Sequence, residues 1–282
     1  MSQPPVLKHA PPVITPGIPV AKAAAPAKGR RDLTLVLGAL PQETELVEKS
    51  LKGIRRKRLG PFAYTEGRIA GRRVVVAATG IGKTCAAMIT TLFVDHFRPR
   101  ELLMTGTASR INPEVRNGDV IVGEITCNHD FGHLIADYAM EYFGAEGALG
   151  EQMAVIYPGD RGLLAAARRA IRRHVPEPAT QHTPAYEPVV RLGRITSGDQ
   201  FGITAERVAA IRRQLQVDLM EMESGSVAQV CRYFGIPFLC IRSGSNLTQN
   251  SPDNDYRKLS PFASRQAALF TVSLIGELAS RA

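Results

Sequence analysis

Short apolar runs and helical patterns alternate along most of this chain of 282 residues. From Asp32 onward, six runs rich in β-branched residues close on Gly or a polar residue, which is typical of buried or half-buried strands. The predicted strands are 33–40, 72–80, 101–107, 118–126, 191–198 and 236–244. Helical patterns are predicted at 83–97, 160–174, 204–215, 223–234 and 261–281. This alternation favours a single α/β domain with one central sheet flanked by helices.

The first 31 residues differ from the rest of the chain. They hold seven of the 19 prolines, five Lys or Arg and no acid. Such a stretch cannot bury enough apolar surface to offset its ordering entropy, so we expect a disordered tail at 1–31 and a folded domain at 32–282. The tail supplies +5 of the net charge of +9, which leaves +4 on the domain. That excess is too small to favour a nucleic-acid partner.

The four cysteines, Cys85, Cys127, Cys231 and Cys240, lack the spacing of metal or redox sites. Each lies in an apolar context, so we expect buried free thiols in a reducing compartment. No run in the sequence is apolar enough to span a membrane, and the N-terminus lacks a secretory signal. We therefore expect a cytoplasmic protein without a membrane partner.

Small and polar residues follow several predicted strands, and in α/β folds ligands bind at the carboxyl ends of strands. One of these junctions, GIGKT at 80–84, resembles part of a phosphate-binding loop. The full loop requires a glycine at position 77, where this chain has Ala77. A tight strand-to-helix turn, in which glycine lets the backbone approach a ligand, is the favoured interpretation.

Two carboxylates stand where the chain otherwise builds core, in VDLMEMESGSVAQV at 217–230. Glu221 and Glu223 flank Met222 at the start of a predicted helix, where the helix dipole alone would favour an acid. A carboxylate at this sheet edge can also accept two hydrogen bonds from a vicinal diol, such as that of ribose. Two further residues allow the same two interpretations, structural or ligand-binding. Glu43 follows the first predicted strand, near the start of a helix, and Phe201 lies in TSGDQFG after a later strand.

Eight stretches, taken in order, carry a resemblance to a known family. They are LGALPQE, TGIGK, MTGTAS, NGDVIVGEI, HDFG, TSGDQF, MEMESGSVAQVC and GIPFLCIRSGSN. Their order and spacing resemble the methylthioadenosine/S-adenosylhomocysteine nucleosidases, members of the nucleoside phosphorylase superfamily, over residues 33–281. The resemblance implies a mixed sheet of nucleoside phosphorylase type, a homodimer, and a hydrolase that cleaves the N9–ribosyl bond of purine nucleosides without metal or organic cofactor.

The resemblance also implies roles for single residues. Glu223 binds the ribose hydroxyls, with Met222 packed beside the sugar, and Glu43 orients the attacking water. Thr79 and Gly80 match the loop over the sugar, and Phe201 matches the aromatic ring against the base. Further polar residues of the site are Glu221, Arg242 and Ser245. His129 and Asp130 match an HD pair near the dimer contact, where we expect a structural role.

The chain departs from the family at one position. Where the resemblance implies an aspartate that protonates the purine, this chain has Asn246. An amide hydrogen-bonds but delivers no proton at pH 7, and general-acid help is worth about 10² to 10⁴ in rate. Three hypotheses stay open: a hydrolase or phosphorylase of a 6-oxopurine nucleoside or futalosine; a weakened adenine nucleosidase; or a catalytically silent nucleoside-binding relative. Both Glu43 and Glu223 are retained, which favours an enzyme.

Water is the expected nucleophile. A phosphorylase needs several cationic groups on phosphate. The loop GALPQE contains no arginine, and the carboxylate of Glu43 would repel phosphate.

Overall fold

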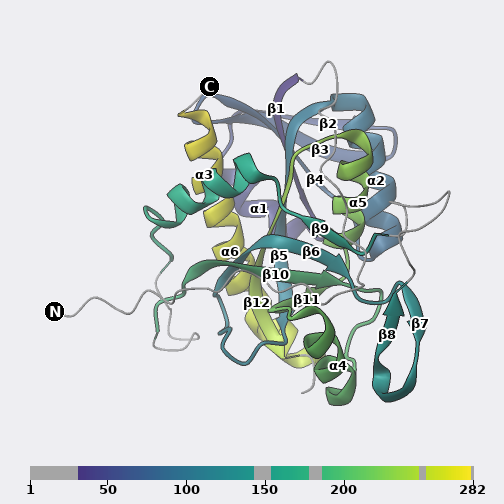
Figure 1. Cartoon of the computed structure of the whole chain (residues 1–282). Helices are drawn as coiled ribbons and strands as arrows, with labels where there is room; N and C mark the ends of the chain where they lie inside the picture. The colour runs from purple at the N-terminus through teal and green to yellow at the C-terminus, as the bar shows by residue number, and fades with distance from the viewer. Residues whose placement is uncertain (1–30, 143–153, 178–185, 248–251, 281–282) are drawn as a thin grey trace.

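The computed structural model describes residues 31–142, 154–177, 186–247 and 252–280, and in them strands and helices alternate as expected (Figure 1). The strands are β1 (Arg31–Gly38), β2 (Lys52–Leu59), β3 (Phe62–Ile69), β4 (Arg72–Ala78), β5 (Pro99–Arg110), β6 (Val120–Asn128), β7 (Gly132–Leu134), β8 (Met140–Tyr142), β9 (Ile156–Pro158), β10 (Val190–Ser197), β11 (Leu219–Glu221) and β12 (Phe238–Leu247). The helices are α1 (Pro41–Lys49), α2 (Lys83–Phe97), a 3-10 turn η1 (Ala136–Tyr138), α3 (Arg161–Ile171), α4 (Ala205–Leu215), α5 (Ser224–Phe234) and α6 (Pro252–Ala279). The predicted tail lies outside the described residues except for Arg31, which begins β1.

One mixed sheet organises the chain, in the order β11-β10-β6-β12-β5-β1-β4-β3-β2. The strands β1, β4, β5 and β12 pair in parallel, whereas β6 pairs with β12 antiparallel. Because β11 also pairs with β5, the strands β5, β12, β6, β10 and β11 close into a ring. The expected α/β fold with a central mixed sheet is confirmed.

Helices cover both faces of the sheet (Figure 1). In β1, alternate residues face opposite sides. Leu35 packs in a cluster with α2 and α5, whereas Val36 packs in a second cluster with α1, α3 and α6. The helix α4 packs with β6 and β11 in a third cluster. Buried apolar layers therefore hold the strands rigidly, and the site is built where those strands end.

The short strands β7, β8 and β9 escaped prediction from sequence, and so did two larger features of the fold. The first is the hairpin β2–β3, whose strand β2 forms the edge of the sheet and has seven exposed residues out of eight. Its basic sequence KGIRRKRL shows no apolar alternation, because an exposed edge strand avoids pairing with other chains by carrying charge. The second is the start of α6, which precedes the predicted start at Pro261 and places that proline inside the helix.

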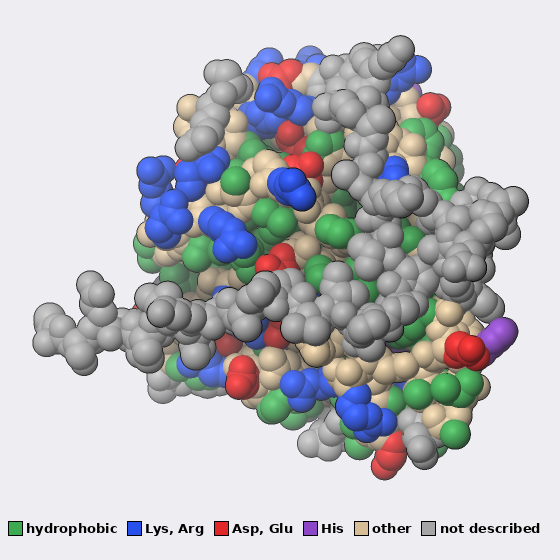
Figure 2. Space-filling view, viewed as in Figure 1, with side chains coloured by type: hydrophobic (Ala, Val, Ile, Leu, Met, Phe, Trp, Pro, Cys, Tyr) green, Lys and Arg blue, Asp and Glu red, His purple; other side chains and the backbone are tan. Residues whose placement is uncertain are grey.

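Four arginines lie in the last turn of α3 and just after it, and Figure 2 shows basic side chains gathered on this side of the molecule. Arg168 and Arg172 are exposed to solvent. Arg169 and Arg173 instead bind the carboxylate of Glu277, at 2.5 and 3.0 Å, so part of this positive charge is neutralised within the fold.

All four cysteines are free thiols, and three of them are buried as expected. Cys85 differs, because it lies half-exposed on the first turn of α2. Among the described helices, none has the length and apolar content needed to cross a membrane.

Candidate active site

A cavity of about 370 Å³ opens at the strand ends. Its lining is Ala39, Leu40, Glu43, Ile81, Thr107, Ala108, Ser109, Gln200, Phe201, Met220, Glu221, Met222, Glu223, Ser245, Asn246 and Tyr256. Acidic and small polar side chains meet apolar ones in this lining, and no Lys, Arg or His side chain is among its described residues. The cavity therefore suits a ligand with an apolar body and several hydroxyl groups, and it disfavours a free anion.

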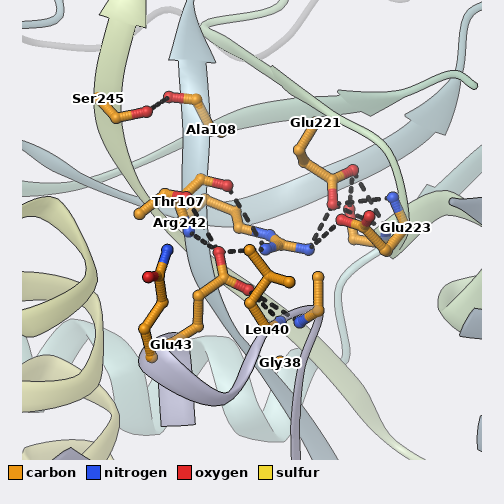
Figure 3. A network of polar contacts seen from close by, with 12 residues as sticks. Gly38, Leu40, Glu43, Thr107, Ala108, Glu221, Glu223, Arg242 and Ser245 are labelled. Atoms are coloured by element: carbon orange, nitrogen blue, oxygen red, sulfur yellow. Dashed lines mark hydrogen bonds and ion pairs between the residues drawn. The ribbon is translucent and has the colours of Figure 1, made fainter. Parts of the chain in front are cut away.

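Glu43 is buried, and its carboxylate is held from both ends (Figure 3). Oε2 accepts hydrogen bonds from the backbone N–H of Ala39 (2.8 Å) and Leu40 (3.1 Å), which makes Glu43 a cap of its own helix. Oε1 accepts from the backbone N–H and the hydroxyl of Thr107, at 2.7 and 2.9 Å. Four donors fix this carboxylate, so its position is determined before any substrate arrives.

Arg242 lies behind the cavity and joins three carboxylates (Figure 3). Its Nη2 donates to Glu221 Oε2 (2.5 Å) and Glu223 Oε2 (3.2 Å), and its Nη1 lies 3.6 Å from Glu43 Oε1. The guanidinium fits here because Gly106 has no side chain. A Cβ at Gly106 would lie 2.3 Å from Nη1 and 2.6 Å from Glu43 Oε1.

The start of α5 holds the other two carboxylates. Glu221 accepts from the backbone N–H of Glu223 (3.1 Å) and from the hydroxyls of Ser197 and Ser224. Glu223 accepts from the backbone N–H of Gly82 at 2.9 Å, which joins α5 to the turn before α2. The glycine turn predicted at GIGKT therefore holds a carboxylate of the protein rather than a phosphate.

One guanidinium does not balance three carboxylates, and the pKa values differ accordingly. Burial and the neighbouring charges of Glu221 and Glu43 raise the pKa of Glu223 to about 8. Burial also opposes the charge of Glu221, but Arg242 and the hydroxyls of Ser197 and Ser224 outweigh it and lower the pKa of Glu221. Burial opposes the charge of Arg242 as well, yet the carboxylates around it raise its pKa further. Glu223 is therefore the acid that takes up a proton near neutral pH.

A second polar group lies further along β5 and β12 and carries no charge. The Asn246 amide donates from Nδ2 to Ser109 Oγ (3.1 Å) and to the Leu247 carbonyl (3.3 Å). The Ser245 hydroxyl lies within hydrogen-bonding distance of Asn246 Oδ1 (3.0 Å) and of the Ala108 carbonyl (3.1 Å). Asn246 is 1% exposed, so the protein fixes its amide.

Two aromatic rings stand at the cavity mouth. Phe201 is 47% exposed, and its ring meets that of Tyr256 edge to face, with centroids 6.3 Å apart. The Tyr256 hydroxyl accepts a hydrogen bond from Gln42 Nε2 at 3.2 Å. A large ring left half in solvent beside a cavity is available to cover a flat ligand.

The structure brings most of the expected site residues to this cavity, namely Glu43, Phe201, Glu221, Met222, Glu223, Ser245 and Asn246. Thr79, Gly80 and Arg242 do not line it. The Thr79 hydroxyl instead donates to its neighbour's carbonyl, and Ile81 and Gly82 approach the cavity in place of Thr79 and Gly80. Sequence reasoning missed Thr107, Ser109 and Tyr256.

His129 and Asp130 lie outside the cavity. The ring of His129 is fully buried, with Nδ1 3.2 Å from the hydroxyl of Thr196, and burial lowers its pKa to about 4. Asp130 forms an ion pair with Lys83 and accepts from the backbone N–H of Asp199 at 2.9 Å. Both therefore join the loops around the cavity.

Arg242 occupies the centre of the three carboxylates, where a cation would otherwise sit. Within the described residues, no set of three His, Cys, Asp or Glu side chains is arranged to hold a metal ion.

The geometry agrees with the comparisons with known proteins. The model of the phosphorylase superfamily matches residues 34–276. The 5'-methylthioadenosine/S-adenosylhomocysteine nucleosidase of Lysinibacillus sphaericus is 30% identical over 244 residues, which cover 86% of this chain and 98% of that protein.

The chain belongs to the 5'-methylthioadenosine/S-adenosylhomocysteine nucleosidase family of the phosphorylase superfamily. It is thus an enzyme of the N-glycosyl hydrolase class, and the expected assignment to purine nucleoside N-ribosyl hydrolases is confirmed at the level of the family.

Solved structures share this fold. The nucleosidase of Neisseria meningitidis, in complex with methylthio-immucillin-A, has a TM-score of 0.74 at 29% identity, over 87% of this chain and 99% of that one. The futalosine hydrolase of Helicobacter pylori also has a TM-score of 0.74, over 87% and 98% of the two chains, but at 23% identity it supports the fold alone.

Proposed function

We propose that this protein cleaves the N9–C1′ bond of a purine nucleoside with water, and that the cavity described above is its active site. The observation that carries the proposal is the buried group of Glu43, Glu221 and Glu223 around Arg242. Cleavage builds positive charge on the ribose, and fixed carboxylates stabilise that charge more than they stabilise the neutral substrate.

Glu223 is the residue proposed to bind the ribose diol. Within the described part of the chain, its carboxyl group at the cavity wall has two hydrogen-bond donors, Gly82 and Arg242, so it retains capacity for hydroxyl groups. Its raised pKa lets it act as donor or acceptor near neutral pH. Met222 lies beside it in the cavity lining and supplies an apolar contact for the sugar ring.

Glu43 is proposed to orient the attacking water. All four acceptor positions of its carboxylate are taken, three of them by backbone N–H groups that cannot turn away. The fourth donor, the hydroxyl of Thr107, can rotate, and Thr107 lines the cavity. Water therefore reaches Glu43 by replacing this hydroxyl. The oxygen of this water bonds to C1′ while the N9–C1′ bond breaks, and the electron pair of that bond stays on the base. One proton passes in net from water to the purine.

Water is favoured over phosphate by the charge of the site. The described lining carries three carboxylates and no cationic side chain, and both Nη atoms of Arg242 are engaged with carboxylates or the Thr107 carbonyl. Phosphate would enter a negative field without a partner.

Base release from purified protein tests the proposal. The substrates are 5'-methylthioadenosine, S-adenosylhomocysteine, inosine and futalosine, each with and without phosphate, with products separated chromatographically. We expect release that does not depend on phosphate. Release only with phosphate would replace water by phosphate as nucleophile, and no release from any of them would contradict the proposed activity.

A catalytically silent nucleoside-binding protein is the second candidate, and Asn246 is the observation that favours it. Restoring the acid with Asn246→Asp separates the two candidates. An enzyme whose acid is missing should release adenine about tenfold faster or more, since general-acid help is worth about 10² to 10⁴. A silent binder should bind base and release none in either form.

The homodimer is also a proposal. Exposed apolar side chains gather on the turn before α2, on α2 and around the β7–β8 hairpin: Ile81, Met88, Leu134, Ile135 and Tyr138. The ion pair between Lys83 and Asp130 joins these two segments. Such a surface is typical of a partner-binding site. Sedimentation should show a dimer that Met88→Glu weakens, whereas Arg172→Glu on α3 should leave it intact.

The cytoplasm is the proposed location. Its support is the set of four free thiols, because paired cysteines are the norm in oxidising compartments.

A further inference from the structure

Ser109 lies beside Asn246 in the uncharged part of the cavity lining. It follows Thr107 by two residues on β5, so both side chains face the same side of the sheet. Thr107 contacts Glu43 at the sugar end. Two residues of strand advance roughly 6–7 Å, which places Ser109 about one ring further into the cavity.

Ser109 and Asn246 each keep one hydrogen-bonding position that the protein does not fill in the described part of the chain. Both hydrogens of the Asn246 amide are engaged, one by Ser109 Oγ and one by the Leu247 carbonyl. The single proton of the Ser245 hydroxyl serves either Asn246 Oδ1 or the Ala108 carbonyl, so Oδ1 keeps at least one lone pair. Ser109 Oγ accepts from Asn246, and its own proton meets no acceptor in the described part of the chain.

The pair therefore offers one donor and one acceptor side by side in the cavity lining. The donor is the hydroxyl of Ser109, and the acceptor is Oδ1 of Asn246. The matching edge of adenine carries an acceptor at N7 and a donor at the exocyclic amine, whereas a 6-oxopurine carries two acceptors there. A 6-oxopurine would set its O6 against the free lone pair of Asn246.

We propose that Ser109 donates the hydrogen bond to purine N7 that Asn246 cannot supply, and that Asn246 accepts from the exocyclic amine of a 6-aminopurine. This inference rests on the proposed function. The Asn246 amide is then the anchor that turns the proton of Ser109 toward the base. The neutral hydroxyl lowers the energy of the departing base by hydrogen bonding, while the base takes its proton from water.

The test is calorimetric titration with adenine, 7-deazaadenine and hypoxanthine. The wild-type protein should bind adenine about 5- to 10-fold more tightly than 7-deazaadenine, in which N7 is a C–H group. It should also prefer adenine to hypoxanthine. Ser109→Ala should lose the preference for adenine over 7-deazaadenine and bind 7-deazaadenine as the wild type does.

Ser243→Ala is the matched control, a buried serine on β12 outside the cavity lining, and should keep the preference. The inference is overturned if the wild type does not distinguish adenine from 7-deazaadenine, a result that needs no variant to fold. It is also overturned if Ser109→Ala weakens both bases equally or neither. If the wild type still releases base from a nucleoside, only the role of Ser109 is lost; if it neither binds nor releases any base, the proposed function fails with it.

Discussion

The two ends of the cavity differ in charge and in how completely their groups are used. The end proposed to bind the sugar, called the sugar end, holds the three buried carboxylates of Glu43, Glu221 and Glu223 around Arg242, and four donors saturate Glu43. The end proposed to bind the purine, called the base end, holds Ser109, Ser245 and Asn246, which are neutral and keep free hydrogen-bonding capacity. Fixed charge thus lies where the reaction would develop charge, and neutral dipoles lie where the leaving group would be recognised.

Because of this contrast, replacing a residue should have different effects at the two ends of the cavity. At the sugar end a lost carboxylate or guanidinium leaves buried charge without a partner, which affects both the rate and the stability of the fold. At the base end a replaced side chain removes one neutral hydrogen bond or one ring contact, each worth about 1 kcal/mol.

The largest expected effect is that of Glu43→Gln. The amide has the same shape, but its NH₂ group would face backbone N–H donors, and it cannot orient or deprotonate water. We expect kcat/KM for base release to fall by about 10² to 10⁴. Glu45→Gln is the matched control, because Glu45 lies on the same helix and forms an exposed ion pair with Lys49. If kcat/KM falls less than tenfold in Glu43→Gln, Glu43 does not take part in the reaction.

Arg242→Met tests how far the fold itself depends on the sugar end. Without the guanidinium, the buried carboxylates of Glu221 and Glu223 lose their shared cation. We expect the free energy of unfolding to fall by about 3–5 kcal/mol in urea titration. In contrast, Arg265→Met, which breaks a solvent-exposed pair with Glu177, should cost about 1 kcal/mol or less. If both variants lose the same free energy of unfolding, the buried network contributes no more to stability than an exposed ion pair.

The pH dependence of stability is the third test. The pKa of Glu223 is raised from 4.5 to about 8, so the folded state holds its proton more tightly than the unfolded state. That stabilisation is complete below the unfolded pKa and is lost as the pH rises toward 8. We expect stability to fall between pH 6.5 and 8, by at most about 1.4 kcal/mol per pH unit.

Glu223→Gln should flatten this slope, because an amide does not titrate. The window starts at pH 6.5 because His129, with its pKa lowered to about 4, acts in the opposite direction below that value. A wild-type slope that survives in Glu223→Gln would assign the titration to another group.

The sequence predicted the sugar end better than the base end, and the reason is physical. Glu43 lies in the first turn of α1 and Glu223 is the N-cap of α5, each shortly after a strand, where the period of the apolar pattern makes an acid conspicuous. Their convergence follows from the shared edge of parallel strands. Arg242 was expected at the cavity wall but lies behind the carboxylates, because pattern alone does not give the depth of a side chain.

The base end depended on element boundaries, which sequence patterns locate poorly. The strand predicted to end at 107 continues to Arg110, and this extension places Ser109 beside Asn246. The helix predicted to start at Pro261 begins at Pro252, and its early turns bring Tyr256 to the cavity mouth. A serine or tyrosine beyond the predicted end of an element gives no periodic signal.

The smallest expected effect concerns the two rings at the mouth. Tyr256→Phe keeps the edge-to-face contact with Phe201 and loses the hydroxyl, whose hydrogen-bond partners are Thr107, Gln42 and Ser260, so KM should change by about twofold or less. Tyr256→Ala removes the ring itself, and because an aromatic pair contributes about 0.5–1.5 kcal/mol, KM should rise about 3- to 10-fold. Among the described hydrogen bonds, none joins Tyr256 or Phe201 directly to a carboxylate of the cavity, so kcat should remain within about twofold in both variants. A fall in kcat that matches the rise in KM would mean that the rings help to position the reacting bond, and the division between a charged reacting end and a neutral binding end would no longer hold.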